Sequence, residues 1–186
     1  MKDLKDYAGT RRLNWGCGRH VAPGWVNCDI KQGPWIDVSC DIRDGLPMPD
    51  ASFEYAVSIH ALQEIPHFDL VPVLSELKRV LAPGGVLRLC LPDFEKGLSA
   101  YAARDGSYFL VPDQEARTLS GKLMVQLLWY GWSRSLFTHE YVEELLLRAG
   151  FNAVRRCSFK TTSCAFAEIT ELDNRGAESM FVEAIH

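Results

Sequence analysis

The sequence lacks the features that mark several large classes of protein. Its 6 cysteines include no Cys-x-x-Cys pair, so no two ligands have the close spacing typical of a zinc site. No stretch approaches the roughly eighteen apolar residues of a membrane span, and the N-terminal segment lacks the apolar core of a secretory signal. A formal net charge of −4 provides no basic footprint for nucleic acid. We therefore expect no metal site, no membrane span and no nucleic-acid partner.

The residues that are present are ordinary for one globular domain. Of the 186 residues, 47% are hydrophobic and 24% are charged, which is enough apolar content for a sizeable core. Without paired spacing, the cysteines are interpreted as reduced, mostly buried thiols, which favours the cytoplasm over an oxidising compartment. We predict a single domain over residues 1–186, in which the charged residues 1–10 form an N-terminal arm.

The segment Leu13-Asn14-Trp15-Gly16-Cys17-Gly18 gives the first functional signal. A short apolar run stops there at two glycines that are one residue apart. Glycine permits φ > 0 and lets a ligand approach the backbone without a Cβ in the way. Because open α/β sheets bind ligands at the carboxyl ends of their strands, the pattern predicts a binding loop. An ordinary turn would contain the same two glycines.

Acidic residues follow at two later strand ends. Residues 25–30 have the pattern of a strand with Asp29 near its end, where a carboxylate can accept hydrogen bonds from ribose hydroxyls. Asp41 follows a weaker strand pattern over 36–40. Further strands are predicted at 53–60, 86–91, 151–159 and 180–185, and helices at 67–82, 92–101, 114–130 and 139–149.

These segments together resemble one known family. The string LNWGCG, the strand-end Asp29, the block CDIRDGLPMPDASFEYAVSIHAL and the string RVLAPGGVLRL are similar to class I S-adenosylmethionine-dependent methyltransferases. The similarity runs from about Arg11 to the C-terminus, and it most resembles small bacterial methyltransferases linked to cell-surface polysaccharide synthesis. It implies a single-domain, Rossmann-like α/β fold with a mostly parallel seven-stranded sheet. It also implies S-adenosylmethionine as the cofactor and methyl transfer to a small-molecule or saccharide acceptor.

The resemblance further implies which residues bind the cofactor. They are Asn14, Gly16, Cys17, Gly18, Asp29, Ile30, Asp41, Ile42 and Ser58. Asp29 is expected to hold the ribose, and Asp41 with the Ile42 backbone is expected to contact the adenine. Asn14 stands where many relatives carry an acid for the methionine ammonium, so it could make that contact only through its amide oxygen. The alternatives are a strand-end turn acid at Asp29 and an N-cap at Asp41.

The spacing between the glycine loop and Asp29 bears on the choice of cofactor. Ten residues separate Gly18 from Asp29, which is too few for a full crossover helix, so residues 19–24 are predicted to form a loop. A dinucleotide fingerprint has its acid about 20 residues on and holds pyrophosphate at a helix N-terminus. S-adenosylmethionine has no phosphate, so it does not need a helix N-terminus after the glycine loop. The truncated early crossover helices therefore favour a methyl donor over NAD.

A histidine is the predicted catalytic base. His60 follows a strand end near which the methyl group should point, and the ordinary pKa of imidazole lies near neutrality. His139, at the start of a predicted helix, is the rival base, and either histidine could instead be structural. Residues 101–136 are rich in aromatic side chains and are predicted to form a lid over the acceptor, although such clusters often belong to a core.

Other functions stay open at this point. A catalytically silent S-adenosylmethionine-binding partner subunit would fit Asn14 and the Gln63-Glu64 pair that stands where relatives often have Glu-His. An NAD-type oxidoreductase is opposed by the short spacing after Gly18. Methylation of a nucleic acid is disfavoured by the net negative charge. The sequence predicts no oligomeric state.

Overall fold

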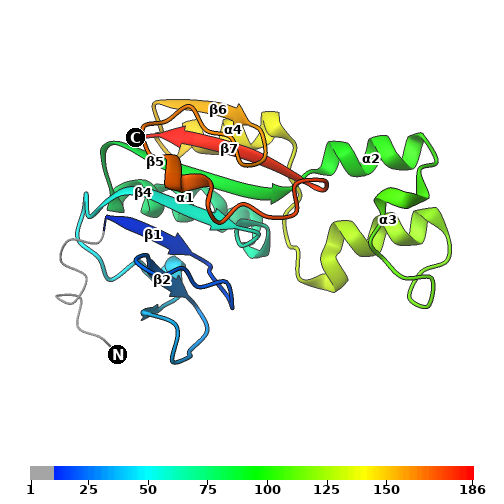
Figure 1. Ribbon diagram of the computed structural model, residues 1–186, viewed down its shortest axis with the longest axis horizontal. Helices are drawn as coiled ribbons and strands as arrows, with labels where there is room; N and C mark the ends of the chain where they lie inside the picture. The colour runs from blue at the N-terminus through cyan, green and yellow to red at the C-terminus, as the bar shows by residue number, and fades with distance from the viewer. Residues whose placement is uncertain (1–10) are drawn as a thin grey trace.

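A seven-stranded sheet forms the centre of the structure (Figure 1). The computed structural model describes residues 11–186, and the N-terminal segment 1–10, for which the sequence makes a separate prediction, lies outside them. The strands are β1 (Arg12–Trp15), β2 (Val26–Asp29), β3 (Val38–Ser39), β4 (Phe53–Ile59), β5 (Leu81–Pro92), β6 (Ala153–Cys157) and β7 (Ser179–Ile185). Their order is β3-β2-β1-β4-β5-β7-β6, with β1 to β5 parallel and β7 antiparallel to both neighbours. The predicted α/β fold is confirmed.

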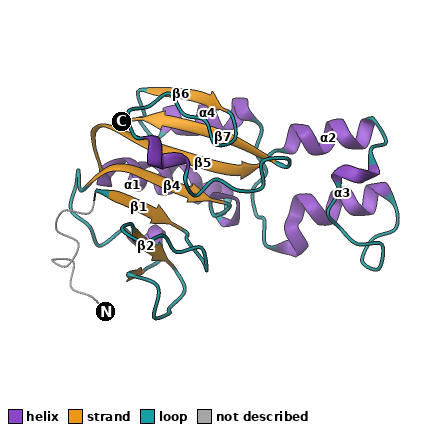
Figure 2. Ribbon diagram, in the orientation of Figure 1, coloured by secondary structure: helices purple, strands orange, loops and turns teal. Residues whose placement is uncertain are grey.

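Two helices cover one face of the sheet. α1 (Leu70–Val80) and α4 (His139–Arg148) lie behind the strands in the view of Figure 2. Side chains alternate between faces along a strand, and Leu87 and Leu89 of β5 join the apolar sides of these helices in the main core. The buried residues of α1 recur at helical spacing: Leu70, Val73, Leu74, Leu77 and Val80. No helix within residues 11–186 is long and apolar enough to cross a membrane.

The helix predicted over 67–82 is shorter at both ends. A 3₁₀ turn precedes it, and the side chain of Asp69, at the N-cap position, makes no capping hydrogen bond. The helix stops at Val80 because Leu81 already pairs with Phe53 at the start of β5. Pro83-Gly84-Gly85, which follow the predicted helix in the sequence, therefore lie within β5, where the pairing with β4 changes register.

The C-terminal connection, residues 158–178, covers the opposite face in place of helices. Phe166 stacks on Tyr55 of β4 with ring centroids 4.8 Å apart, and Ile169 is fully buried in the same cluster. No helix forms over residues 19–24, as the ten-residue spacing predicted. An irregular segment thus shields the apolar side chains of a face that lacks its early crossover helix.

Arg88, in the middle of β5, links this connection to the sheet through buried hydrogen bonds. It is fully buried, and its guanidinium donates to Asp173 through Nε (2.8 Å) and Nη2 (2.6 Å). Nη1 donates to Glu183 Oε1 of β7 at 2.6 Å. A buried cation is tolerated only when it is paired and hydrogen-bonded in this way. The pairing holds the segment that runs toward the carboxyl edge of the sheet.

Residues 94–132, called the arm below, project beyond the carboxyl end of β5 (Figure 1). The arm contains α2 (Phe94–Ala102), α3 (Leu119–Leu128) and a 3₁₀ turn at Trp129–Gly131. Its helices share a small core of their own, formed by Ala100, Phe109, Leu123 and Leu127. The projecting unit therefore includes α2, and it begins before the segment 101–136 that was predicted as a lid.

Candidate active site

β1 ends in the predicted loop, and the loop conformation requires glycine at Gly16. This residue has φ +68°, and the backbone N–H groups of Gly16 and Cys17 donate to Cys28 O at 2.8 and 3.2 Å. A Cβ at Gly16 would lie 2.2 Å from Ala61 Cβ. Gly18 has φ +54°, and no described atom lies within 4 Å of the place its Cβ would take. The loop is therefore packed against the segment after β4 at Gly16 and open at Gly18.

Asp29 lies at the carboxyl end of β2, as predicted, and is only 7% exposed. Its Oδ2 accepts the Gly18 N–H at 2.7 Å, and its Oδ1 accepts the Lys31 N–H at 2.9 Å. Each carboxylate oxygen has a second lone pair, so Asp29 keeps acceptor capacity for a ligand. Burial, reinforced by the Asp29 charge, raises the pKa of the Cys17 thiol to about 12, so Cys17 is not a thiolate nucleophile.

Asn14 is buried at the end of β1. Its Nδ2 donates to His20 O at 2.9 Å and to Asn27 Oδ1 at 3.1 Å. These two bonds use both amide hydrogens, which leaves Oδ1 as the side-chain atom that a ligand could contact. This agrees with the expectation that Asn14 can offer only its amide oxygen.

Asp41 caps the short 3₁₀ helix Ile42–Asp44. Its side chain accepts the Arg43 backbone N–H at 3.0 Å and pairs with the Arg43 guanidinium. Hydrogen bonds from the Arg43 side chain lower the pKa of the Asp41 carboxyl. The N-cap alternative is therefore present, yet Asp41 and the buried Ile42 line the same cavity as Asp29.

His60 follows β4 in a left-handed conformation, with φ +52°. Its Nε2 lies 3.0 Å from Ser179 Oγ and 3.4 Å from Cys90 Sγ. Burial, with a contribution from the charge of Arg175, lowers the pKa of His60 to about 4. The imidazole is therefore neutral at pH 7, and it binds a proton more weakly than an ordinary histidine does.

These residues surround one cavity of about 1260 Å³. Pockets for one small ligand usually span about 300–1000 Å³, so the cavity is wide enough for a cofactor and an acceptor. The predicted residues that line it are Asn14, Gly16, Cys17, Gly18, Asp29, Ile30, Asp41, Ile42 and His60. Ser58 and His139 do not line it. Along β4, Ser58 shares the helix-covered face with Ala56, and its Oγ is buried without a hydrogen-bond partner among the described residues.

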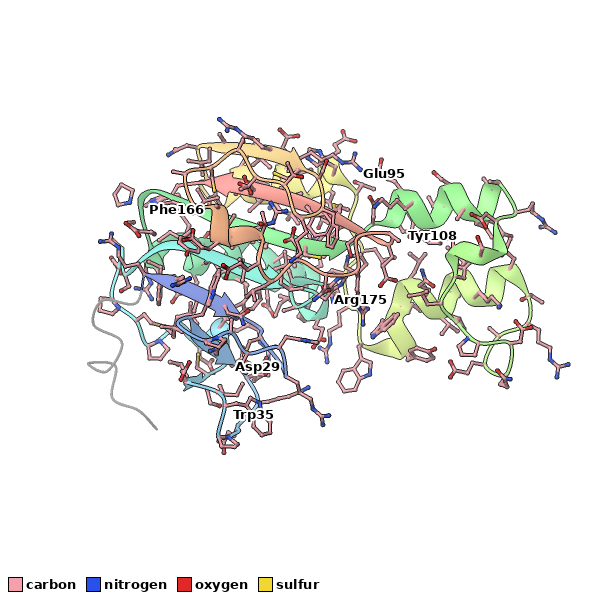
Figure 3. The ribbon with its side chains drawn as sticks, in the orientation of Figure 1. Asp29, Trp35, Glu95, Tyr108, Phe166 and Arg175 are labelled. Carbon is pink, nitrogen blue, oxygen red and sulfur yellow. The ribbon has the colours of Figure 1, made fainter. Side chains whose placement is uncertain are left out.

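The cavity also has walls that the sequence did not reveal. The arm contributes Tyr108, Trp129, Tyr130 and Trp132, and the C-terminal connection contributes Asn174, Arg175 and Glu178. Figure 3 shows Asp29, Arg175 and Tyr108 in succession across the carboxyl edge of the sheet toward the arm. Because β7 runs antiparallel to β5, the residues just before β7 reach the edge where the parallel strands end. The turn composition of residues 173–176 was the one local signal in this segment.

Comparisons with known proteins agree with this architecture. Residues 17–89 match the family described as methyltransferase domain, and a search of curated protein sequences finds no match. A S-adenosylmethionine-dependent methyltransferase structure from Archaeoglobus fulgidus superposes with a TM-score of 0.61 at 14% identity, over 98% of this chain and 91% of that one. The fold is that of class I S-adenosylmethionine-dependent methyltransferases. Methyltransferase structures from Thermotoga maritima (TM-score 0.58, 19% identity, 94% of this chain and 81% of that one) and Mesorhizobium loti (0.52, 19%, 95% and 90%) share it.

The methyltransferase family match and fold indicate S-adenosylmethionine as the cofactor. The described residues fit this group, because the buried Asp29 retains acceptor capacity and no helix N-terminus follows the glycine loop to hold a pyrophosphate. When bound, the cofactor supplies a methyl group already activated on a sulfonium. Within residues 11–186, no three His, Cys, Asp or Glu side chains gather closely enough to hold a metal ion.

Proposed function

We propose that this protein is a S-adenosylmethionine-dependent methyltransferase that acts on a small-molecule or saccharide acceptor. The observation that carries the proposal is the buried Asp29 carboxylate, held by the Gly18 N–H at 2.7 Å at one end of a large cavity. The other end of that cavity is bounded by the ends of β4 and β5 and by the aromatic arm. One end suits a nucleoside, and the other has space for an acceptor.

In this proposal the cofactor lies over the ends of β1, β2 and β3. Asp29 accepts hydrogen bonds from the ribose, Asp41 and Ile42 adjoin the adenine, and Asn14 Oδ1 faces the ammonium group. Because the methyl group is already activated, alignment of the acceptor supplies most of the rate. The sequence predicts His60 as the base, but the low pKa of His60 makes it a weak one.

Calorimetry with purified protein tests the proposal. The wild-type protein should bind S-adenosylmethionine or its demethylated product and should not bind NADH. Asp29→Ala should weaken binding by about 1–3 kcal/mol, the range for removing a buried or charged hydrogen-bond partner. Asp44→Ala is the matched control, because Asp44 is exposed and does not line the cavity. An unchanged affinity in Asp29→Ala would remove Asp29 from the binding site.

A catalytically silent partner subunit is the second candidate, and Asn14 favours it. An amide in place of a carboxylate loses the charge attraction for the cofactor ammonium. Binding of the cofactor without methyl transfer to any acceptor would support this role. The link to cell-surface polysaccharide synthesis and the cytoplasmic location are proposals as well. They rest on the sequence resemblance and on the six cysteines, all of which are free thiols.

A further inference from the structure

One of the carboxylates that line the cavity has a buried oxygen atom that accepts no hydrogen bond from the described residues. The six are Asp29, Asp41, Glu64, Asp93, Glu171 and Glu178. Glu64 and Glu171 are exposed to water. Asp93 accepts two backbone N–H groups from the first turn of α2, at 3.1 and 3.2 Å. Glu178 is different, because its side chain is 12% exposed and its Oε1 accepts no hydrogen bond from any residue within 11–186. Such a group in a native protein calls for a role.

Glu178 lies where an acceptor would meet the methyl group. Its backbone carbonyl accepts the Asp93 N–H at 2.9 Å at the end of β5. The next residue, Ser179, contacts His60 Nε2 at the end of β4. A cofactor held over β1, β2 and β3, as in the proposed function, must direct its methyl group toward this half of the sheet edge.

Arg175 is the cation that pairs with Glu178. Its Nη1 lies 3.5 Å from Glu178 Oε1, and its guanidinium lies 4.5 Å from the centre of the Trp129 ring. Burial raises the pKa of the Glu178 carboxyl, and the Arg175 charge opposes that shift. Because the two charges balance, this end of the cavity suits a neutral acceptor better than a cationic amine. A guanidinium beside the reacting oxygen would also stabilise the negative charge that develops there.

Other lining groups indicate what the acceptor carries. Gln63 Oε1 and Asn174 Oδ1 are buried hydrogen-bond acceptors without a donor among the described residues. An O–H or N–H group of a ligand would satisfy each of them. The arm adds the rings of Trp132 and of Trp129, one face of which lies against the Arg175 guanidinium, and flat apolar surfaces of this kind pack well against a ring compound. A hydroxyl-rich ring meets both requirements.

We propose that Glu178 is the catalytic base and that the acceptor is a neutral saccharide methylated on a hydroxyl oxygen. The hydroxyl oxygen forms the new bond to the methyl carbon, and the hydroxyl proton passes to Glu178. The carbon–sulfur bond of the methylsulfonium donor breaks, and its electron pair stays on sulfur as a thioether. His60, neutral and hydrogen-bonded to Ser179, is then a positioning residue. This inference rests on the proposed function.

Methyl transfer from radiolabelled S-adenosylmethionine tests both the role of Glu178 as the base and the neutral saccharide as the acceptor. The probes are glucose, galactose and mannose, each paired with its 2-amino sugar. Label should enter the neutral sugars, and Glu178→Gln should lower kcat about 100-fold or more while the calorimetric Kd for the cofactor stays within about twofold. Glu168→Gln is the matched control, because Glu168 lies in the same connection, is exposed and does not line the cavity.

A titration that needs no acceptor gives an independent result. With ¹³C-labelled glutamate carboxyls, the signal that is missing from Glu178→Gln should titrate above the ordinary value of about 4.3. Burial also raises the pKa of Glu64, and its signal should persist in Glu178→Gln. Asp93 and Tyr108 adjoin Glu178 besides Arg175, so Asp93→Asn and Tyr108→Phe should move this signal without removing it.

The outcomes separate the inference from the proposed function. If the wild-type protein does not bind S-adenosylmethionine, the proposed function fails and the inference fails with it. If the cofactor binds, three results overturn the inference alone: label on the amino sugars only or on no sugar, full turnover by Glu178→Gln, or an ordinary pKa for Glu178.

Discussion

Gly16 packs so closely against Ala61 that the candidate site has no room for a side chain at position 16, and the substitution Gly16→Ala tests this contact. In Gly16→Ala the new Cβ would lie 2.2 Å from Ala61 Cβ. Carbon atoms in contact are about 3.5–4.0 Å apart, so the two segments must separate by roughly 1.3 Å or more. The residue must also keep φ +68°, a left-handed conformation that costs an L-residue roughly 1–2 kcal/mol.

These two costs give the expected loss of stability. Overpacking of this kind costs about 1–3 kcal/mol, so Gly16→Ala should lower the free energy of unfolding by about 2–5 kcal/mol in total. Gly18→Ala is the matched control, because Gly18 has φ +54° and no described atom within 4 Å of its Cβ position. It should lose only the conformational part, about 1–2 kcal/mol. Urea unfolding of the ligand-free proteins measures both losses without any contribution from cofactor contacts.

A second substitution isolates the steric part. Ala61→Gly removes the atom that the new methyl group would strike, so Gly16→Ala should cost about 1–3 kcal/mol less in that background. The reasoning is refuted if Gly16→Ala is no more destabilising than Gly18→Ala. It is equally refuted if the two substitutions show no coupling.

The remaining predictions concern the buried cation, the neutral histidine and the arm. Arg88→Met leaves two buried carboxylates without their cation and should lower the free energy of unfolding by about 3–5 kcal/mol, whereas the exposed Arg148→Met should change it by less than about 1 kcal/mol. The pKa of His60 is about 4 in the folded protein against an ordinary 6.5, so the unfolded state binds more protons between these values. Stability should therefore fall as the pH is lowered from 6.5 to 4, and His60→Gln should flatten that part of the curve. In the arm, Trp132→Ala should chiefly raise the KM of the acceptor, and amide exchange over 94–132 should slow when ligands bind. Protection equal to that of β4 without ligand would mark the arm as core.

Much of the half of the site proposed to bind the cofactor was predictable because its signals are local. The glycines end β1, Asp29 ends β2, and the ten residues between Gly18 and Asp29 are too few for a helix whatever the rest of the chain does. Two helix starts were predictable for the same reason. The Asp93 and Thr138 side chains accept backbone N–H groups within three residues of themselves, so the capping pattern is complete in the sequence.

The tertiary structure decided the features that depend on pairing between distant segments. α1 ends at Val80 because Leu81 pairs with β4. Ser58 does not line the cavity because its side chain lies on the sheet face that the helices cover. The half of the cavity proposed to bind the acceptor also depends on pairing between distant strands. Glu178 reaches the carboxyl edge because β7 inserts antiparallel between β5 and β6. The turn composition of residues 173–176 predicts a turn but not its position, because strand partners and their direction are fixed by burial and hydrogen bonding across the whole sheet.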